Sequence, residues 1–295
     1  GNVFMGYVAG DATTTADNNT GVGYAALGAN TTGANNNAFG SGALDANTTA
    51  DNNCAFGSNA LSSNTTGHSL CAMGKSAGFS NTTGNLNTML GFDAGSGMST
   101  GINNTTVGAN CGENITTGSY STMIGSGVTI KSATTDNANG FGFEVEAETG
   151  YTTVGITTSD IRAQHGVATW ATVSDRRVKK DIEDSSAGLS FINDLKPRTF
   201  NYKNKGDLPK EFRGYEKDST EPYKFDTTNH GFIAQEVKET IDNHPEIVDG
   251  FKMWSVMESG QQEVAEAALI PMLVKSIQEL STQVDELKAK LNKGE

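Results

Sequence analysis

The chain has 295 residues, a formal net charge of −13 at pH 7 and three cysteines. The acidic balance argues against a nucleic-acid partner and against attachment to an anionic membrane surface, since both need clustered Lys and Arg. Three cysteines are too few for a disulfide framework, and no apolar run approaches the roughly 20 residues of a membrane-spanning helix. We therefore expect no nucleic-acid partner and no direct membrane insertion.

The first part of the chain, residues 1–130, repeats with a strict period. The period equals the distance in sequence between Gly6 and Gly23. The same glycine recurs in each repeat and always follows an apolar residue. These glycines are Gly6, Gly23, Gly40, Gly57, Gly74, Gly91, Gly108 and Gly125. A strict repeat indicates a rod in which each unit contacts mainly its neighbours.

Each repeat is rich in Asn, Thr and Gly, which favour turns and strands over helix interiors. We expect short strands such as 37–39, stacked about 4.8 Å apart, so that equivalent residues form ladders. The apolar ladder is Met5, Val22, Phe39, Phe56, Met73, Leu90, Val107 and Ile124. One large apolar residue per coil is a thin core for a single chain. We therefore predict a homotrimer in which three chains pool their ladders around one axis.

The repeat resembles those of phage tail fibres and the heads of trimeric autotransporter adhesins, which implies an extended multimeric β rod. The chain starts with Gly1-Asn2-Val3, which is neither a secretory signal nor an initiator Met. We expect a C-terminal piece of a longer fibre whose missing part holds the anchor.

Cys54 and Cys71 are separated by one full repeat and so occupy the same ladder position on adjacent coils. Two interpretations are open: a disulfide, or two small apolar residues stacked in the rod. The preference of free cysteine for burial favours the second. Cys111 lies off that ladder.

The period is lost after Ile130, and residues 131–173 are expected to form a small β neck or tip. Four aromatic residues fall in this stretch: Phe141, Phe143, Tyr151 and Trp170. They form the core of a small β-domain, or some of them stack on a sugar at the fibre tip. We retain all four as candidate receptor-binding residues.

A charged segment, Ser174-Asp175-Arg176-Arg177-Val178-Lys179-Lys180, then opens the last part of the chain. Two more motifs follow, Leu195-Lys-Pro-Arg-Thr-Phe200 and His230-Gly-Phe-Ile-Ala-Gln-Glu-Val237. Together they resemble the C-terminal intramolecular chaperone domain of phage tailspikes, tail fibres and endosialidases, over residues 174–295. The resemblance implies trimer assembly followed by self-cleavage between Val173 and Ser174.

By position in that family motif, Ser174 is the nucleophile and Lys179 the general base, while Asp175 and Arg177 orient the loop. A serine hydroxyl needs such a base, and a lysine can serve where burial or nearby cations favour its neutral form. Arg176 and Lys180 add such cations. On spacing alone, a basic, solvated loop that opens a domain is the favoured interpretation.

The end of the chain, about 264–292, carries a heptad pattern. The seam residues are Ile270, Leu273, Ile277, Leu280, Val284, Leu287 and Leu291. β-Branched residues at one core position with Leu at the other favour a coiled coil of two helices. The thin rod core and the family resemblance favour three chains. A single amphipathic helix packed on its own domain is the alternative. Pro271 predicts a kink or a late helix start.

The predicted protein is mostly β: a trimeric β-solenoid or β-roll rod (1–130), a small β neck (131–173) and an α+β chaperone domain (174–295) ending in a coiled coil. We interpret it as the distal part of an adhesive fibre, on a virion tail or on a bacterial surface, that recognises a host or prey glycan or protein receptor. A bacterial surface or predation fibre with a permanent cap and a glycan-depolymerising tailspike are the alternatives. No histidine stands at metal-ligand spacing, so neither a metal nor a cofactor is expected.

Overall fold

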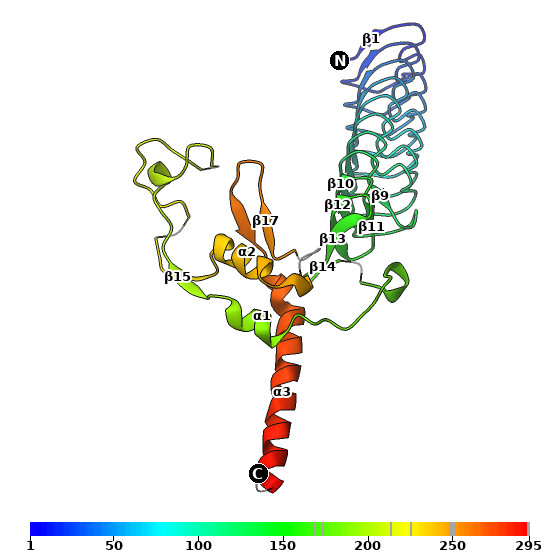
Figure 1. The fold of residues 1–295 in the computed structure, drawn as a ribbon. Coiled ribbons are helices and arrows are strands. Elements are labelled where there is room, and N and C mark those ends of the chain that lie inside the picture. Colours follow the sequence, from blue (N-terminus) through cyan, green and yellow to red (C-terminus); the bar gives the residue numbers. More distant parts are fainter. Residues whose placement is uncertain (168, 173, 213, 225, 248–251, 294–295) are drawn as a thin grey trace. The chain divides into compact units, whose positions relative to one another are not determined.

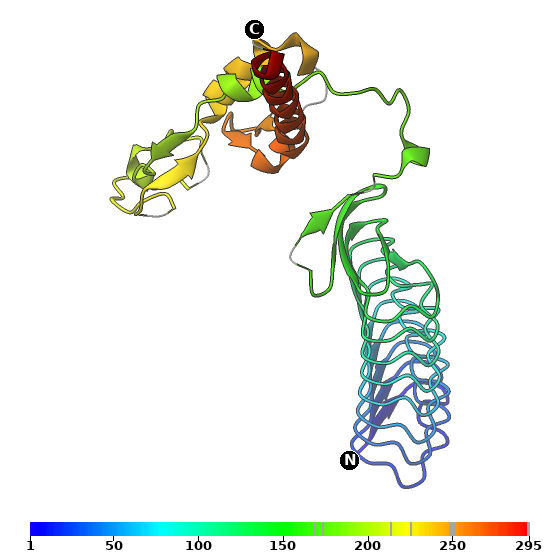
Figure 2. The same cartoon turned by 90° about the horizontal axis from the view of Figure 1, so that it is seen from below.

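The computed structural model describes residues 1–167, 169–172, 174–212, 214–224, 226–247 and 252–293. The chain divides into two compact units, Gly1–Val178 and Lys179–Glu295, and each is described by itself. The first unit is a stack of coils that ends in antiparallel strands, and the second carries the α-helices (Figures 1 and 2).

The coils of the first unit each contribute one short strand, and all of these strands are parallel and in register, one repeat apart. The strands are β1 (Val3–Met5), β2 (Thr20–Val22), β3 (Asn37–Phe39), β4 (Cys54–Phe56), β5 (Cys71–Met73), β6 (Thr88–Leu90), β7 (Thr105–Val107) and β8 (Thr122–Ile124). The expected β-solenoid, with its strand at 37–39, is confirmed.

Parallel stacking continues past the last repeat. The elements that follow are β9 (Thr129–Ile130), β10 (Asn139–Phe143), β11 (Glu146–Ala147), β12 (Tyr151–Ile156), β13 (Ser159–Gln164) and β14 (Trp170–Ala171). β10 pairs in parallel with β8, and β11 with β9. β12, β13 and β14 then form an antiparallel meander on the same sheet, which has twelve strands in all.

The core of the solenoid lies inside one chain. The middle residue of each strand points inward, as Ala38, Ala55 and Ala72 do, and each is fully buried. A second buried column comes from the turns and contains Ala26, Ala43, Ala60, Ala77, Ala94, Cys111, Val128 and Val145. The solenoid therefore closes its own core, and the inference that one chain has too thin a core to hold a solenoid is wrong.

Large and small residues alternate between facing columns of this core. Leu44 and Leu61 are fully buried on the coils whose inward strand residues are Ala38 and Ala55. Gly78 and Gly95 take the leucine position on the next coils, and a Cβ on either glycine would lie within 3 Å of the Met89 side chain. This pairing of large with small side chains is what close packing of a narrow interior requires.

Buried asparagines hydrogen-bond to the backbone within and between coils. In one ladder Asn19, Asn36 and Asn53 each accept, through Oδ1, the N–H of the equivalent residue one repeat later. Their Nδ2 groups donate to carbonyl oxygens 14 positions later. A second ladder runs through Asn30, Asn47, Asn64 and Asn81. Buried polar groups are costly unless hydrogen-bonded, so the ladders account for the repeated Asn.

The apolar ladder preceding the glycines lies on the outside of the sheet. It continues through the later strands as an unbroken row of register partners, here called the outer stripe. The outer stripe contains Met5, Val22, Phe39, Phe56, Met73, Leu90, Val107, Ile124, Phe141, Val154 and Ile161. Met5 is 67% exposed, Met73 47% and Ile124 42%. These residues are therefore a surface, not the interior of the coil.

The second unit is an α+β domain. Its elements are α1 (Leu189–Asp194), β15 (Arg198–Phe200), η2 (Lys205–Asp207), β16 (Asn229–Gly231), α2 (Ala234–Asp242), η3 (Pro245–Ile247), β17 (Trp254–Val256), β18 (Gln262–Val264), η4 (Glu266–Leu269) and α3 (Ile270–Lys293). Phe191, Val237 and Met253 form the buried centre, with Ala187, Leu195, Ile241, Ile247 and Leu269 around them.

The long helix α3 packs against α1 and leaves most of its apolar face open. The backbone N–H of Leu189 donates to Glu279 Oε2 at 2.8 Å. Ile270, Ile277, Leu287 and Leu291 on the expected seam are 61%, 66%, 59% and 75% exposed. Pro271 stands in the first turn, where its missing N–H costs no helical hydrogen bond. The late helix start is confirmed.

Candidate functional site

Two motifs that lie far apart in the sequence meet in the second unit. β15 carries the end of the motif at 195–200, and β16 the start of the motif at 230–237. The two strands are antiparallel, with Arg198 opposite Gly231 and Phe200 opposite Asn229. The hydrophobic residues of these motifs, among them Leu195 and Val237, enter the buried core. The motifs therefore build the frame of this unit.

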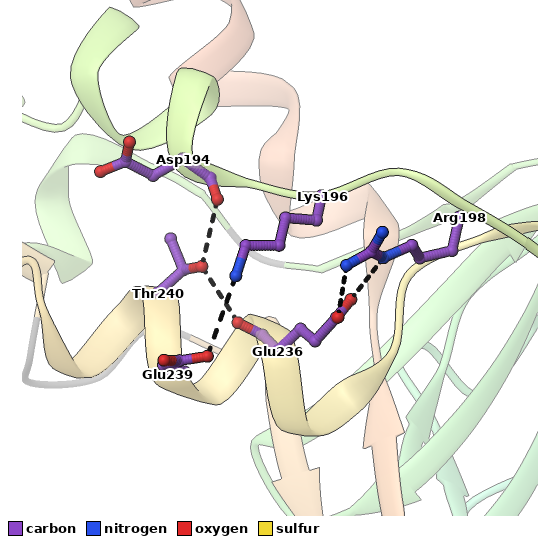
Figure 3. Close-up of polar contacts among 6 residues, drawn as sticks. All are labelled: Asp194, Lys196, Arg198, Glu236, Glu239 and Thr240. Carbon is purple, nitrogen blue, oxygen red and sulfur yellow. Dashed lines mark hydrogen bonds and ion pairs between the residues drawn. The ribbon is translucent and has the colours of Figure 1, made fainter.

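The charged residues of the same motifs bind each other across the surface (Figure 3). The Arg198 guanidinium donates to both carboxylate oxygens of Glu236, at 2.9 and 2.6 Å. This pair lowers the pKa of Glu236, chiefly through the hydrogen bond, and raises that of Arg198. Lys196 makes a looser pair with Glu239 at 4.0 Å, and the Thr240 hydroxyl donates to the Asp194 carbonyl oxygen at 3.4 Å. α2 is thus fastened to the chain between α1 and β15.

His244 joins the end of α1 to η3. Its Nε2 lies 2.8 Å from Asp194 Oδ2 and its Nδ1 lies 2.8 Å from Glu246 Oε1. The ring is buried and meets the Phe191 ring edge-on at 5.3 Å. The hydrogen bond to Glu246 is the main cause that raises the pKa of His244, and burial opposes it. With a carboxylate at each nitrogen, the arrangement suits the imidazolium, which donates from both.

The segment that begins at Ser174 is exposed along its described length. Asp175 accepts the backbone N–H of Arg177 at 2.8 Å and its guanidinium Nη2 at 2.6 Å, closing a tight turn into η1 (Arg176–Val178). The Arg177 side chain lowers the pKa of Asp175. Asp175 and Arg177 therefore contact each other directly. Ser174 and Lys179 are exposed on either side of this turn, and Val173 lies outside the described residues.

Comparison with protein-family models gives a match that starts at the exposed segment and extends through the two paired motifs. Residues 174–245 match the family described as Peptidase_S74, chaperone of endosialidase. The match begins at Ser174, includes all three motifs and covers about a quarter of the chain. It confirms the resemblance for these residues. The searches of curated proteins and of solved structures found no match.

A pocket of about 1070 Å³ opens beside the paired strands of the endosialidase-chaperone segment. Phe200, Tyr202 and Tyr223 line it, and these rings contact one another edge-on at 5.5 and 6.0 Å. His230 of the third motif and Gln261 also line it, and Gln261 Nε2 donates to the Tyr223 hydroxyl at 3.2 Å. The pocket mixes aromatic and polar walls and is shared between the matched segment and the β17–β18 hairpin.

The four aromatic residues of the predicted neck do not form one cluster. Phe141 belongs to the outer stripe, and Phe143 lies opposite Ile156 in the same register. Trp170 pairs with Ala163 and is 57% exposed. Tyr151 alternates to the other face, where the Arg162 guanidinium lies 5.4 Å from its ring. The cation–π pair and the Arg162–Glu148 bond of 2.9 Å fix this end of the sheet.

Sequence reasoning missed three contacts: Arg198 with Glu236, His244 with its two carboxylates, and Tyr151 with Arg162. The first could have been suspected, because both residues fall inside the recognised motifs. Within the described ranges, no group of three or more His, Cys, Asp or Glu is placed to hold a metal ion. No helix among the residues that the structure describes is long and apolar enough to span a membrane.

Proposed function

We propose that the chain is the distal part of a homotrimeric adhesive fibre whose C-terminal domain assembles three chains in register. The observation that carries this proposal is the outer stripe. It runs along eleven successive strands, a length of roughly 48 Å at the spacing of a β-sheet. Large exposed apolar patches mark interaction sites in soluble proteins.

The partner that best fits the stripe is another copy of the same rod. The stripe contains no charged residue, so pairing buries apolar surface without stranding a charge. A second rod has the same spacing at each strand, and each Phe or Met can meet its equivalent. The seam of α3 is also exposed on the same chain. Parallel association of the rods covers the outer stripe, association of the helices covers the α3 seam, and the endosialidase-chaperone match supports three chains.

We further propose that the chaperone domain releases itself by cleavage between Val173 and Ser174. Ser174 acts as the nucleophile and Lys179 as the base, with the Asp175–Arg177 turn holding the loop. A lysine needs a desolvated setting to act as a base. Because Lys179 is exposed in the single chain, cleavage depends on assembly to enclose the loop. Phe141, Phe143, Tyr151 and Trp170 then remain at the exposed end as the receptor-binding candidates.

One experiment tests assembly and another tests release. Light scattering of the purified wild type should give three chains, and Phe56→Asp with Met73→Asp should give single chains. The control, Phe79→Ser with Leu86→Ser, replaces exposed apolar residues outside the stripe and should stay trimeric. A monomeric wild type, or a stripe variant that behaves like the control, would refute the assembly proposal.

Intact mass under denaturing conditions tests release. Wild type should yield a fragment that ends at Val173 and one that starts at Ser174. Ser174→Ala and Lys179→Ala should each yield one intact chain. An intact wild type together with a trimer by light scattering would instead favour the fibre with a permanent cap, and the search for the receptor site would move to the cap.

A further inference from the structure

Cys54 and Cys71 are direct register partners on β4 and β5. Neighbouring parallel strands lie about 4.7–4.9 Å apart, and disulfides join Cα atoms about 4.4–6.8 Å apart. Both side chains are half-buried and lie on the outer face of the sheet, in the column beside the outer stripe. The backbone geometry therefore admits a bond between them without moving either strand far.

The column holds cysteine at these two neighbouring strands alone. Its other members from β1 to β10 are Val3, Thr20, Asn37, Thr88, Thr105, Thr122 and Asn139. Two small apolar residues stacked for packing would be replaceable by the Thr or Asn of the other coils. What distinguishes β4 and β5 from the other strands of this column is a pair of adjacent thiols.

The same place is where the first Asn ladder is interrupted. Leu70 stands on the coil of β5, at the position that is Asn19, Asn36 and Asn53 on the coils before it. Asn53 Oδ1 still accepts the Leu70 N–H at 3.0 Å. Leu70, however, has no side-chain oxygen to accept the N–H of Asn87, although Asn87 itself accepts that of Asn104 at 2.8 Å. The stack is thus short of side-chain hydrogen bonds at the coil that carries Cys71.

We infer that Cys54 and Cys71 of one chain form a disulfide that ties β4 to β5 where the asparagine ladder is interrupted. The oxidising surroundings come from the proposed extracellular fibre, whereas the pairing itself rests on the rod alone. The bond closes a loop of one repeat, and restricting a loop in the unfolded chain stabilises the folded state. The coil around Leu70 gains a covalent connection in place of the missing side-chain bonds.

The reaction balances as a thiol–disulfide exchange with a small disulfide such as oxidised glutathione. One cysteine thiolate attacks a glutathione sulfur, forms a mixed disulfide and expels one glutathione thiolate. The second cysteine thiolate then attacks the protein sulfur of that mixed disulfide and expels the other. One disulfide has been exchanged for another, and the two protons lost by the cysteines reside on the two glutathione thiols.

The rate of this exchange depends on the pKa of the attacking thiol. Burial raises the pKa of Cys54, and the neighbouring Cys71 raises it further. Less thiolate is present near neutrality, so oxidation is expected to be slow at pH 7 and faster at about pH 8.5. Cys111 is fully buried, with its pKa raised to about 11, and lies off the Cys54–Cys71 column. It serves as the matched internal control.

The test treats the folded, reduced full chain with oxidised glutathione and reads thiol content, intact mass and non-reduced peptide maps. Wild type and Cys111→Ser should each lose two hydrogens in mass and give a peptide that links Cys54 to Cys71. Cys54→Ser and Cys71→Ser should give a glutathione adduct without that peptide. Hydrogen exchange at the Asn87 and Cys71 amides should slow after oxidation of the wild type.

Two results would overturn the inference. The first is a folded wild type that keeps all three thiols while the denatured chain oxidises under the same conditions. The second is a linkage between chains, or one that includes Cys111, seen as crosslinked bands on a non-reducing gel. Light scattering of the same samples reports the oligomeric state separately, so a failed trimer and a failed disulfide give different results.

Discussion

Arg198 and Glu236 hold each other through two hydrogen bonds, although they lie 38 positions apart in the sequence. Arg198 begins β15 and Glu236 lies in the first turn of α2, so the pair ties a strand to a helix (Figure 3). The planar fork of arginine matches both carboxylate oxygens, which the ammonium of lysine cannot do. The pair therefore orients α2 on the frame of the chaperone segment.

Arg198→Lys should loosen α2 while keeping the charge. We expect faster hydrogen exchange at the amides of α2 and no change in the solenoid. Lys196→Gln is the matched control, because its single contact of 4.0 Å with Glu239 is of a kind that contributes little. Equal exchange rates in wild type and Arg198→Lys would show that the pair is incidental.

The recurring glycine of the solenoid has a steric cause that can be tested at Gly57. Its φ is +143°, and a Cβ there would lie 2.3 Å from the carbonyl oxygen of Gly74 on the next coil. Gly57→Ala should cost more than the roughly 1–3 kcal/mol of backbone strain alone, because a backbone clash adds to it. Thermal unfolding followed by circular dichroism measures the loss.

Gly150→Ala supplies the control for this prediction. Its φ of +76° is also unfavourable for alanine, but nothing lies within 4 Å of the added Cβ. Its cost should stay near the roughly 1–2 kcal/mol of the left-handed conformation. Similar unfolding temperatures for the two variants would mean that close stacking of coils does not fix the glycine.

The regular spacing of the repeated glycines made the solenoid predictable, because a strict repeat leaves few architectures and the strand at 37–39 follows from its composition. The side of each strand that faces the core was harder to predict. Phe39 and Phe56 are larger than Ala38 and Ala55, and size suggested that they fill the interior. The interior is instead narrow and takes alanine beside Leu44 and Leu61.

The motifs of the second unit could be recognised in the sequence, whereas the contacts between their residues could not be predicted from it. The sequence suggested that Ser174 and Lys179 act together because of their family positions, and the structure leaves that a prediction. The Arg198–Glu236 pair needs the antiparallel register of β15 and β16, which no local pattern in 195–237 specifies. The outer stripe, by contrast, follows from the repeat once the inward residue of a single coil is known.

Leu70 offers a test of the asparagine ladders. Leu70→Asn should restore an acceptor for the Asn87 N–H and a donor for the Gly84 carbonyl oxygen, as at equivalent positions. Each hydrogen bond contributes about 1 kcal/mol, which roughly offsets the loss of a buried leucine, about 1.5–3 kcal/mol. The variant should unfold near the wild-type temperature, with slower hydrogen exchange at the Asn87 amide.

Leu61→Asn is the matched substitution at a position without a ladder. Leu61 is fully buried in the apolar core of the solenoid, so this variant should lose about 2–5 kcal/mol. If both variants are equally destabilised, the hydrogen-bond account of the ladder is wrong.

His244 predicts how the stability of the second unit changes with pH. Its pKa is raised above the ordinary 6.5 by the hydrogen bonds to Glu246 and Asp194, so the folded state binds the proton more tightly than the unfolded state. The stabilisation is therefore complete below about pH 6.5 and is lost as the pH rises through the raised value. The pKa of Glu246 is lowered from 4.5 by His244, so its contribution is lost as the pH falls below about 4.5.

Urea unfolding of the second unit should accordingly be hardest between about pH 4.5 and 6.5 and easier at pH 8. His244→Gln should remove the decline above about pH 6.5, because glutamine keeps polar contacts without taking up a proton. His230→Gln, on the exposed side of β16, should keep the wild-type profile. A wild-type profile that is flat across this interval would mean that His244 stays neutral and donates to only one of its two carboxylates.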